Sequence, residues 1–88
     1  MARAIDQIIA RLNADVPDVH IAQLHVSHPG ADDDGLWFIG ISGRAETVQV
    51  ESSDGNCPLL IESDFSADRL HGHTVDEVVV QVKQLYSL

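Results

Sequence analysis

Apolar residues recur at the spacing of an α-helix near both ends of the chain. Intervals of three and four residues place such side chains on one face of a helix. The N-terminal set predicts a helix over residues 2–13 and consists of Ile5, Ile8, Ile9 and Leu12. The C-terminal set consists of Val75, Val78, Val79, Val82, Leu85 and Tyr86. Thr74 and Glu77 have the spacing of a capping box, so we expect the second helix to begin directly after Thr74.

Between the helices, the pattern of apolar and polar residues predicts four β-strands. Their expected positions are Val19–Val26, Leu36–Ile41 and Glu46–Ser52, with a fourth strand through Leu59 and Ile61. In the first strand, Ala22, Leu24 and Val26 share one face because side chains alternate along a strand. Residues 28–35 are polar and predict a long loop. Residues 65–73 have no regular period, and we expect an irregular segment there.

Two short turns predict the register of the last three strands. Gly43, in residues 42–45, suits the first central position of a type II′ turn, and Asp54-Gly55, in residues 53–56, is a type I′ signal. Pairing outward from these turns sets five pairs: Ile41 with Glu46, Ile39 with Val48, Trp37 with Val50, Val50 with Leu59 and Val48 with Ile61. Opposed residues share a face. The expected inner face therefore consists of Trp37, Ile39, Ile41, Val48, Val50, Leu59 and Ile61.

These elements predict an α+β fold of the two-layer sandwich type, in the order α-β-β-β-β-α. A chain of 88 residues has enough material for one core, so we expect a single domain over residues 1–88. The short loops predict a four-stranded antiparallel meander. Both apolar helix stripes need cover, and the inner face of the sheet supplies it, so we expect the two helices on that one face.

The opposite face of the predicted sheet combines apolar and acidic residues. It carries Leu36, Phe38, Gly40, Thr47, Gln49, Glu51, Leu60 and Glu62. A sheet face that only meets solvent is typically more uniformly polar. We therefore interpret Leu36, Phe38 and Leu60 as the centre of a protein interface and Glu51 and Glu62 as its rim. The alternative is that three separate apolar residues on a surface have no function.

Charge narrows the class of partner. The formal net charge is −9, and nine of the fourteen acidic residues lie between Asp32 and Asp68. Repulsion from phosphate groups disfavours binding to nucleic acid. The same field favours a basic protein partner, and a homodimer is the second possibility. No apolar run is long enough to span a bilayer, and the acidic residue in the first turn does not suit a signal peptide, so we expect a cytoplasmic protein with no membrane association.

No catalytic motif or cofactor site is evident in the sequence. Cys57 is the single cysteine, which excludes an internal disulfide, and the nearby acidic residues disfavour a reactive thiolate. Ser52 and Ser53 have no general base at a recognisable spacing. Phosphate-binding glycine loops, HExxH and CxxC are absent from the sequence. We therefore expect a non-enzymatic protein without a cofactor, although a minimal enzyme that uses carboxylates remains a third alternative.

The five histidines keep a second alternative open, which is a small-ligand or metal-binding domain. They are His20, His25, His28, His71 and His73. His20 and His25 point to opposite faces of the predicted strand, whereas one glycine between His71 and His73 lets their rings converge. A metal site needs three or four ligands, so two converging rings are insufficient. The acidic run at residues 32–35 does not fit the ligand spacing of an EF-hand and is better explained as a solvated turn.

Part of the chain resembles a group of small acidic bacterial proteins of uncharacterised function. The resemblance extends over roughly residues 36–86 and rests on four stretches: Trp37-Phe38, Val48–Ser53, Cys57–Glu62 and Thr74–Val79. It implies a bacterial origin. In size and acidity the chain is also similar to immunity proteins that neutralise basic toxins. This similarity implies that the partner is a basic protein.

Overall fold

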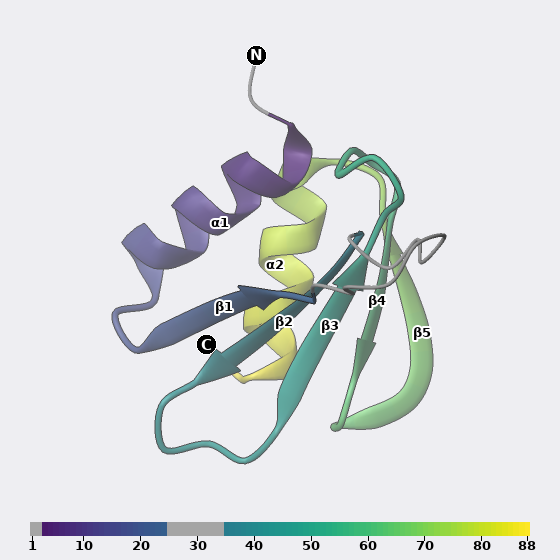
Figure 1. The fold of residues 1–88 in the computed structure, drawn as a ribbon. Coiled ribbons are helices and arrows are strands. Elements are labelled where there is room, and N and C mark those ends of the chain that lie inside the picture. The colour runs from purple at the N-terminus through teal and green to yellow at the C-terminus, as the bar shows by residue number, and fades with distance from the viewer. Residues whose placement is uncertain (1–2, 25–34) are drawn as a thin grey trace.

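Figure 1 shows a computed structural model of the chain, which describes residues 3–24 and 35–88. Helices α1 (Ala4–Asp15) and α2 (Val75–Leu85) come first and last. The strands between them are β1 (Val19–Gln23), β2 (Leu36–Ile41), β3 (Thr47–Glu51), β4 (Leu59–Ser63) and β5 (Ser66–Gly72). They form one antiparallel sheet in the order β1-β2-β3-β4-β5. The fold is α+β and has one strand more than the sequence predicted.

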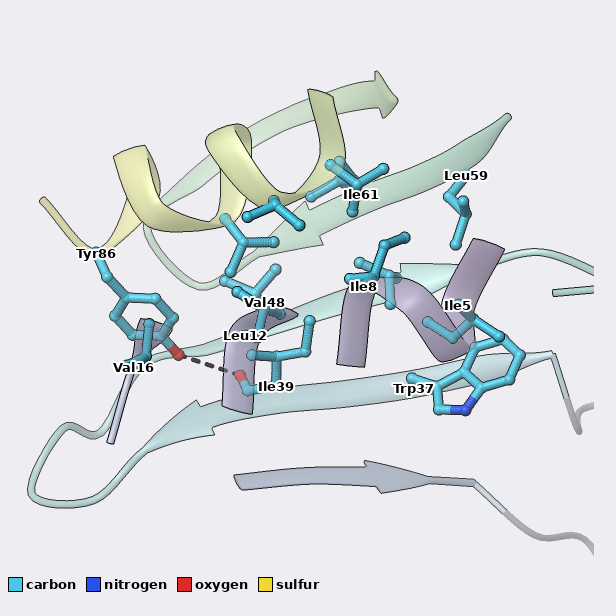
Figure 2. Packing of buried hydrophobic residues seen from close by; sticks show 14 of the residues in the cluster. Ile5, Ile8, Leu12, Val16, Trp37, Ile39, Val48, Leu59, Ile61 and Tyr86 are labelled. Carbon is cyan, nitrogen blue, oxygen red and sulfur yellow. Dashed lines mark hydrogen bonds between the residues drawn. The ribbon is translucent and has the colours of Figure 1, made fainter. Parts of the chain in front are cut away.

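The apolar stripes of both helices pack on the same face of the sheet (Figure 2). The buried helical residues are Ile5, Ile8 and Leu12 of α1 and Val78, Val79 and Val82 of α2. All seven residues expected on the inner face are buried, namely Trp37, Ile39, Ile41, Val48, Val50, Leu59 and Ile61. Burying one such aliphatic side chain stabilises the fold by about 1.5–3 kcal/mol. The predicted layer arrangement and the inner face are therefore confirmed.

The first strand is shorter than expected. Its odd-numbered residues face the core, whereas the prediction had grouped the even-numbered Ala22, Leu24 and Val26 as its apolar face. β1 pairs with β2 through Ile21 opposite Ile39 and Ala22 opposite Phe38. Val19 and Ile21 therefore lie on the inner face, where they are half-buried against the core. Ala22 lies on the opposite face with Phe38. Val26 lies outside the described residues.

The turn between β2 and β3 keeps the predicted register but has a different form. Trp37 pairs with Val50 and Ile39 with Val48, as expected. The amide of Arg44 donates to the carbonyl oxygen of Ile41 over 2.9 Å, which makes Gly43 the second central residue of the turn. Its φ is 85°, a value that suits glycine at that position. The prediction of a type II′ turn is therefore wrong.

Between β3 and β4, the register differs from the prediction by two residues. Val50 pairs with Ile61, and Val48 pairs with Ser63. A wide loop over residues 52–58 takes the place of the tight Asp-Gly turn. Side chains alternate with a period of two, so a shift of two residues leaves every side chain on its predicted face. The shift changes which residues are neighbours across the strands.

Contacts with α1 explain why this loop is wide. The carbonyl oxygen of Gly55 accepts a hydrogen bond from the amide of Ile5 over 2.8 Å. The side-chain oxygen of Asn56 accepts one from the amide of Ala4 over 3.2 Å. The first amides of a helix have no partner within the helix, so the loop satisfies two of them. Asp54 holds the loop in shape by accepting from the amide of Asn56 over 2.9 Å.

The segment expected to be irregular is the edge strand β5. It pairs with β4 through Leu60 opposite His71 and Ile61 opposite Leu70. The pairing is interrupted by a bulge between Ile61 and Ser63 of β4. Most of β5 is exposed, so its sequence lacks the apolar alternation by which a strand is recognised.

The second helix begins where the capping box predicted. The hydroxyl oxygen of Thr74 accepts a hydrogen bond from the amide of Glu77 over 3.1 Å. The carboxylate of Glu77 accepts from the amide of His73 over 3.1 Å, one residue before the position that a standard capping box uses. In the described parts of the chain, no helix is long and apolar enough to cross a membrane.

Candidate functional site on the outer sheet face

The outer face is the side of the sheet that the helices leave uncovered. Cross-strand pairs share a face, so the observed register assigns its residues. They are His20 and Ala22 of β1, Leu36, Phe38 and Gly40 of β2, Thr47, Gln49 and Glu51 of β3, Leu60 and Glu62 of β4, and His71 of β5. All eight residues predicted for this face lie on it.

The apolar residues of the outer face do not form one cluster. Leu36 pairs with Glu51, and Glu51 pairs with Leu60, so the carboxylate lies between the two leucines. In the next row of cross-strand neighbours on this face, Phe38 pairs with Gln49, and Gln49 pairs with Glu62. The predicted register had placed Leu60 opposite Gln49. Leu60 therefore lies beside Glu51 and in a different row from Phe38, so the predicted arrangement of the apolar residues is wrong at Leu60.

The apolar side chains of this face are half-buried, although neither α1 nor α2 covers them. Leu36, Phe38 and Leu60 have intermediate exposure, whereas Glu51 is exposed. Phe38 lies outside the buried core cluster, as the assignment to the outer face requires. The face therefore has partly accessible apolar groups on both sides of an accessible carboxylate.

His20 closes one end of the face. A β-carbon on Gly40 would lie 2.3 Å from Cε1 of His20, so the imidazole ring lies directly over this glycine. No larger residue would fit at position 40 with the ring in place. The His20 ring thereby covers the backbone at Gly40, which is buried, whereas His20 itself and Ala22 are exposed.

Every lysine and arginine of the chain forms an ion pair with a carboxylate. The pairs are Arg3 with Asp6, Arg11 with Asp76, Arg44 with Glu46, Arg69 with Glu62 and Lys83 with Asp15. Both partners are at least partly exposed in each pair, so each contributes little to stability. These pairs nevertheless hold all the positive side chains of the protein in place beside acids. The excess of negative charge therefore remains on the other carboxylates.

The two glutamates of the outer face differ in their surroundings. Glu62 lies 3.7 Å from the guanidinium group of Arg69. The carboxylate of Glu51 has no hydrogen-bond or ion-pair partner among residues 3–24 and 35–88. At the opposite end of β3 from Glu51, Asp64 accepts a hydrogen bond from the amide of Thr47 over 2.9 Å. Glu51 is thus the uncompensated charge of the outer face, and the sequence alone did not distinguish it from Glu62.

The surroundings of Cys57 and Ser52, the two candidate nucleophiles, fit a structural role for both side chains. Burial raises the pKa of the Cys57 thiol, and the nearby charge of Glu77 raises it further. Ser52 is buried, and its hydroxyl lies 2.7 Å from the carbonyl oxygen of Asn56 and 2.9 Å from the Asp54 carboxylate. These contacts close the loop over residues 52–58. They explain why a polar serine is buried beside the core.

The histidines are not brought together with other ligands in the part of the chain that the structure describes. There, no group of three or more His, Cys, Asp or Glu side chains has an arrangement that could hold a metal ion. His71 lies on the outer face opposite Leu60, and His73 follows the end of β5. His25, His28 and the acidic run Asp32-Asp33-Asp34 lie outside the described residues.

A shallow groove of about 340 Å³ runs along the exposed side of α2. It is lined by Asp76, Glu77, Val80, Gln81 and Gln84. These side chains do not include a nucleophile or a histidine. Asp76 is already paired with Arg11, and Glu77 accepts the amide of His73. Both carboxylates of the groove therefore have partners within the protein, unlike Glu51 of the outer face, and the groove is the poorer candidate for a binding site.

Comparison of the chain with protein-family models, curated proteins and solved structures finds no match.

Proposed function

We propose that this protein is a non-enzymatic interaction module that binds a basic protein through the outer face of its sheet. The recognised element would be an arginine or lysine flanked by apolar side chains. An immunity-type inhibitor of a basic toxin and a chaperone for a basic protein are the two forms of this function. The proposed location is the cytoplasm, where the free Cys57 would remain reduced.

The observation that carries the proposal is the position of Glu51. Its exposed carboxylate lies between Leu36 and Leu60 and is not neutralised by a neighbouring cation in the described residues. A guanidinium group can form two hydrogen bonds with a carboxylate, and its flat faces tolerate apolar neighbours. The two leucines would then exclude water from the ion pair, which strengthens it.

The charge of the whole chain supports the same class of partner. All five cationic side chains are held in ion pairs, and the formal net charge is −9. A basic partner would be attracted at long range and would associate faster at low salt. Once docked, it would be positioned by Glu51 and by the apolar groups at Leu36, Phe38 and Leu60.

A peptide that alternates arginine and leucine tests this proposal. Its affinity is measured by calorimetry for the wild type, for Glu51→Gln and for Asp68→Asn. Both variants remove one exposed carboxylate, but Asp68 lies on edge strand β5. We expect Glu51→Gln to weaken binding roughly tenfold and Asp68→Asn to have a much smaller effect, because only Glu51 contacts the guanidinium group directly.

Two further measurements test whether the peptide binds specifically at the outer face or is only attracted by the net charge of the protein. Added salt should weaken binding of the peptide, and a peptide with glutamine in place of arginine should not bind. Equal losses in Glu51→Gln and Asp68→Asn would mean that the peptide only senses net charge. That result would contradict the proposal that the peptide binds at the outer face.

A further inference from the structure

Three of the four aromatic side chains of the protein lie next to an arginine of the same chain. The pairs are Trp37 with Arg3, Phe65 with Arg44 and Tyr86 with Arg44, and the guanidinium carbon lies 5.9, 5.8 and 5.4 Å from the respective ring centroids. A cation within about 6 Å of a ring is attracted by the negative face of its π system. Phe38 is the remaining aromatic side chain, and no arginine or lysine lies over its ring in the described residues.

Each of these two arginines also pairs with a carboxylate. Nε of Arg3 lies 3.2 Å from the carboxylate of Asp6, and a guanidinium nitrogen of Arg44 lies 3.7 Å from that of Glu46. The guanidinium group is planar and delocalised, so one group can pair with a carboxylate and stack on a ring at the same time. Lys83, the single lysine of the chain, also pairs with a carboxylate but lies over no ring among residues 3–24 and 35–88. The protein thus surrounds an arginine with a carboxylate and an aromatic ring twice.

The outer face contains a third combination of a carboxylate and a ring, for which the described residues supply no arginine. Phe38 of β2 lies opposite Gln49 of β3, and Glu51 is two residues further along β3 on the same face. Phe38 and Glu51 are therefore diagonal neighbours, which in a sheet lie about 7–8 Å apart and within reach of long side chains. Phe38 is half-buried and Glu51 is exposed, so a side chain from outside can approach both. A guanidinium group paired with Glu51 is within stacking distance of the Phe38 ring.

The neighbours of this combination leave it open to a guanidinium group. Ala22, which lies opposite Phe38 on β1, has a short side chain and is exposed. The side chain of Gln49 makes no hydrogen bond in the part of the chain that the structure describes, so its amide oxygen can accept from a further N–H of the same group. Glu62 already lies 3.7 Å from Arg69 and is the weaker competitor for an added cation.

We propose that the outer face selects arginine over lysine, because the guanidinium group of the partner pairs with Glu51 and stacks on Phe38. This inference rests on the proposed function, since it concerns the side chain that the same site receives. An ammonium group is a compact and strongly hydrated charge, whereas a guanidinium group is weakly hydrated and has flat faces that stack on rings. Glu51 therefore attracts both kinds of cation, and Phe38 determines which of them binds more tightly.

Two peptides test this selectivity in the wild type. One is the arginine–leucine peptide, and the other has lysine in place of every arginine, so the two peptides carry the same charge. We expect calorimetry to show that the arginine peptide binds roughly five- to tenfold more tightly, which is the size of a cation–π contact at a partly exposed site. Equal affinities would overturn the proposal. This comparison needs no variant and does not depend on the folding of one.

Two variants at one position then assign the selectivity to Phe38. Phe38→Leu keeps an apolar side chain but removes the ring, and Phe38→Tyr keeps the ring. We expect Phe38→Leu to bind both peptides with the affinity that the wild type has for the lysine peptide, and Phe38→Tyr to retain the preference for arginine. Circular dichroism establishes that both variants are folded. A folded Phe38→Leu variant that still prefers arginine would show that the ring is not the selective element.

The Glu51→Gln variant distinguishes a failure of this inference from a failure of the proposed function. Equal affinities for the two peptides that both decrease in Glu51→Gln would leave the proposed function standing and overturn only the selectivity for arginine. Peptides that bind the wild type and Glu51→Gln equally well would contradict the proposed function, and the selectivity with it.

Proton NMR of the bound peptide tests the stacking directly. The ring current of Phe38 should move the δ-methylene protons of the bound arginine upfield in the wild type and in Phe38→Tyr, but not in Phe38→Leu. Arginine δ protons that keep their free shifts on binding to the wild type would contradict a guanidinium group stacked on this ring.

Discussion

The hydroxyl oxygen of Tyr86 lies 2.6 Å from the carbonyl oxygen of Glu46, directly before β3. It also lies 3.1 Å from the carbonyl oxygen of Ile39 in β2 (Figure 2). Tyr86 is 2% exposed and follows the last turn of α2. One side chain therefore joins the end of the second helix to two neighbouring strands, and its hydroxyl is the polar partner of two backbone carbonyl groups.

Tyr86→Phe should lower the free energy of unfolding by about 1 kcal/mol, because the carbonyl groups lose a donor in a buried place. In a domain of this size, that corresponds to a decrease of about 4–8 °C in the melting temperature. Thermal unfolding followed by circular dichroism measures it. An unchanged melting temperature would show that water replaces the hydroxyl without cost.

The same variant should change the response to alkaline pH. Burial raises the pKa of the Tyr86 hydroxyl above its ordinary value of 10.0, and the charge of Glu46 adds to this effect. The unfolded chain therefore loses this proton at a lower pH than the folded chain. The contribution to stability is complete below pH 10 and decreases as the pH rises through the folded pKa. Above pH 10, wild type and Tyr86→Phe should converge in stability.

Thr74→Ala should destabilise the protein by about 1 kcal/mol through loss of the N-cap of α2. The hydroxyl of Thr74 accepts the amide of Glu77, and alanine cannot replace this contact. Thr74→Ser keeps the oxygen and should unfold close to the wild-type temperature. If alanine and serine at this position gave the same melting temperature, the cap would not contribute to stability.

Asn56→Ala should loosen the attachment of α1 to the loop over residues 52–58. The side-chain oxygen of Asn56 accepts the amide of Ala4, so its removal leaves a helix-terminal donor without this partner. We expect a loss of about 0.5–1.5 kcal/mol, measured by urea unfolding. Asn56→Asp retains the oxygen near the start of a helix, where a negative charge is favourable, but it replaces an amide donor to Asp54 with a second carboxylate. It should therefore be more stable than Asn56→Ala and less stable than the wild type.

Gly72→Ala should push α2 away from β5. A β-carbon on Gly72 would lie 2.2 Å from Cγ2 of Val78, which is fully buried. Overpacking of this kind costs about 1–3 kcal/mol. The double variant Gly72→Ala/Val78→Ala removes the colliding methyl groups, so its loss of stability should be smaller than the sum of the two single losses. Additive losses would mean that the two residues do not collide.

Much of the fold follows from local patterns in the sequence. The helical stripes, the cap at Thr74 and the alternation in β2 and β3 act over a few residues, and the structure confirms each of them. β5 was missed because this edge strand has one partly buried apolar side chain, Leu70, between polar residues and a glycine. That glycine is disfavoured in strands by propensity, yet the approach of Val78 requires it.

The candidate site was predicted in composition but not in arrangement. The eight residues predicted for the outer face were assigned correctly, because the face depends only on whether a position is odd or even along its strand. His20, Ala22 and His71 also lie on it and were not predicted. The neighbours of Glu51 depend on the loop over residues 52–58. The shape of that loop depends on hydrogen bonds to α1, including the one between Gly55 and Ile5. Contacts between residues so far apart in the sequence leave no local pattern.

The central claim is that the outer face, and not another acidic surface, binds a cationic partner. Titration of the arginine–leucine peptide into isotope-labelled protein, followed by backbone amide NMR shifts, tests it most directly. We predict that the largest shifts occur at Phe38, Gln49, Glu51 and Leu60, and that they decrease in the Glu51→Gln variant. Shifts concentrated on the α2 groove at Asp76 and Val80, or spread evenly over all exposed acids, would contradict the account.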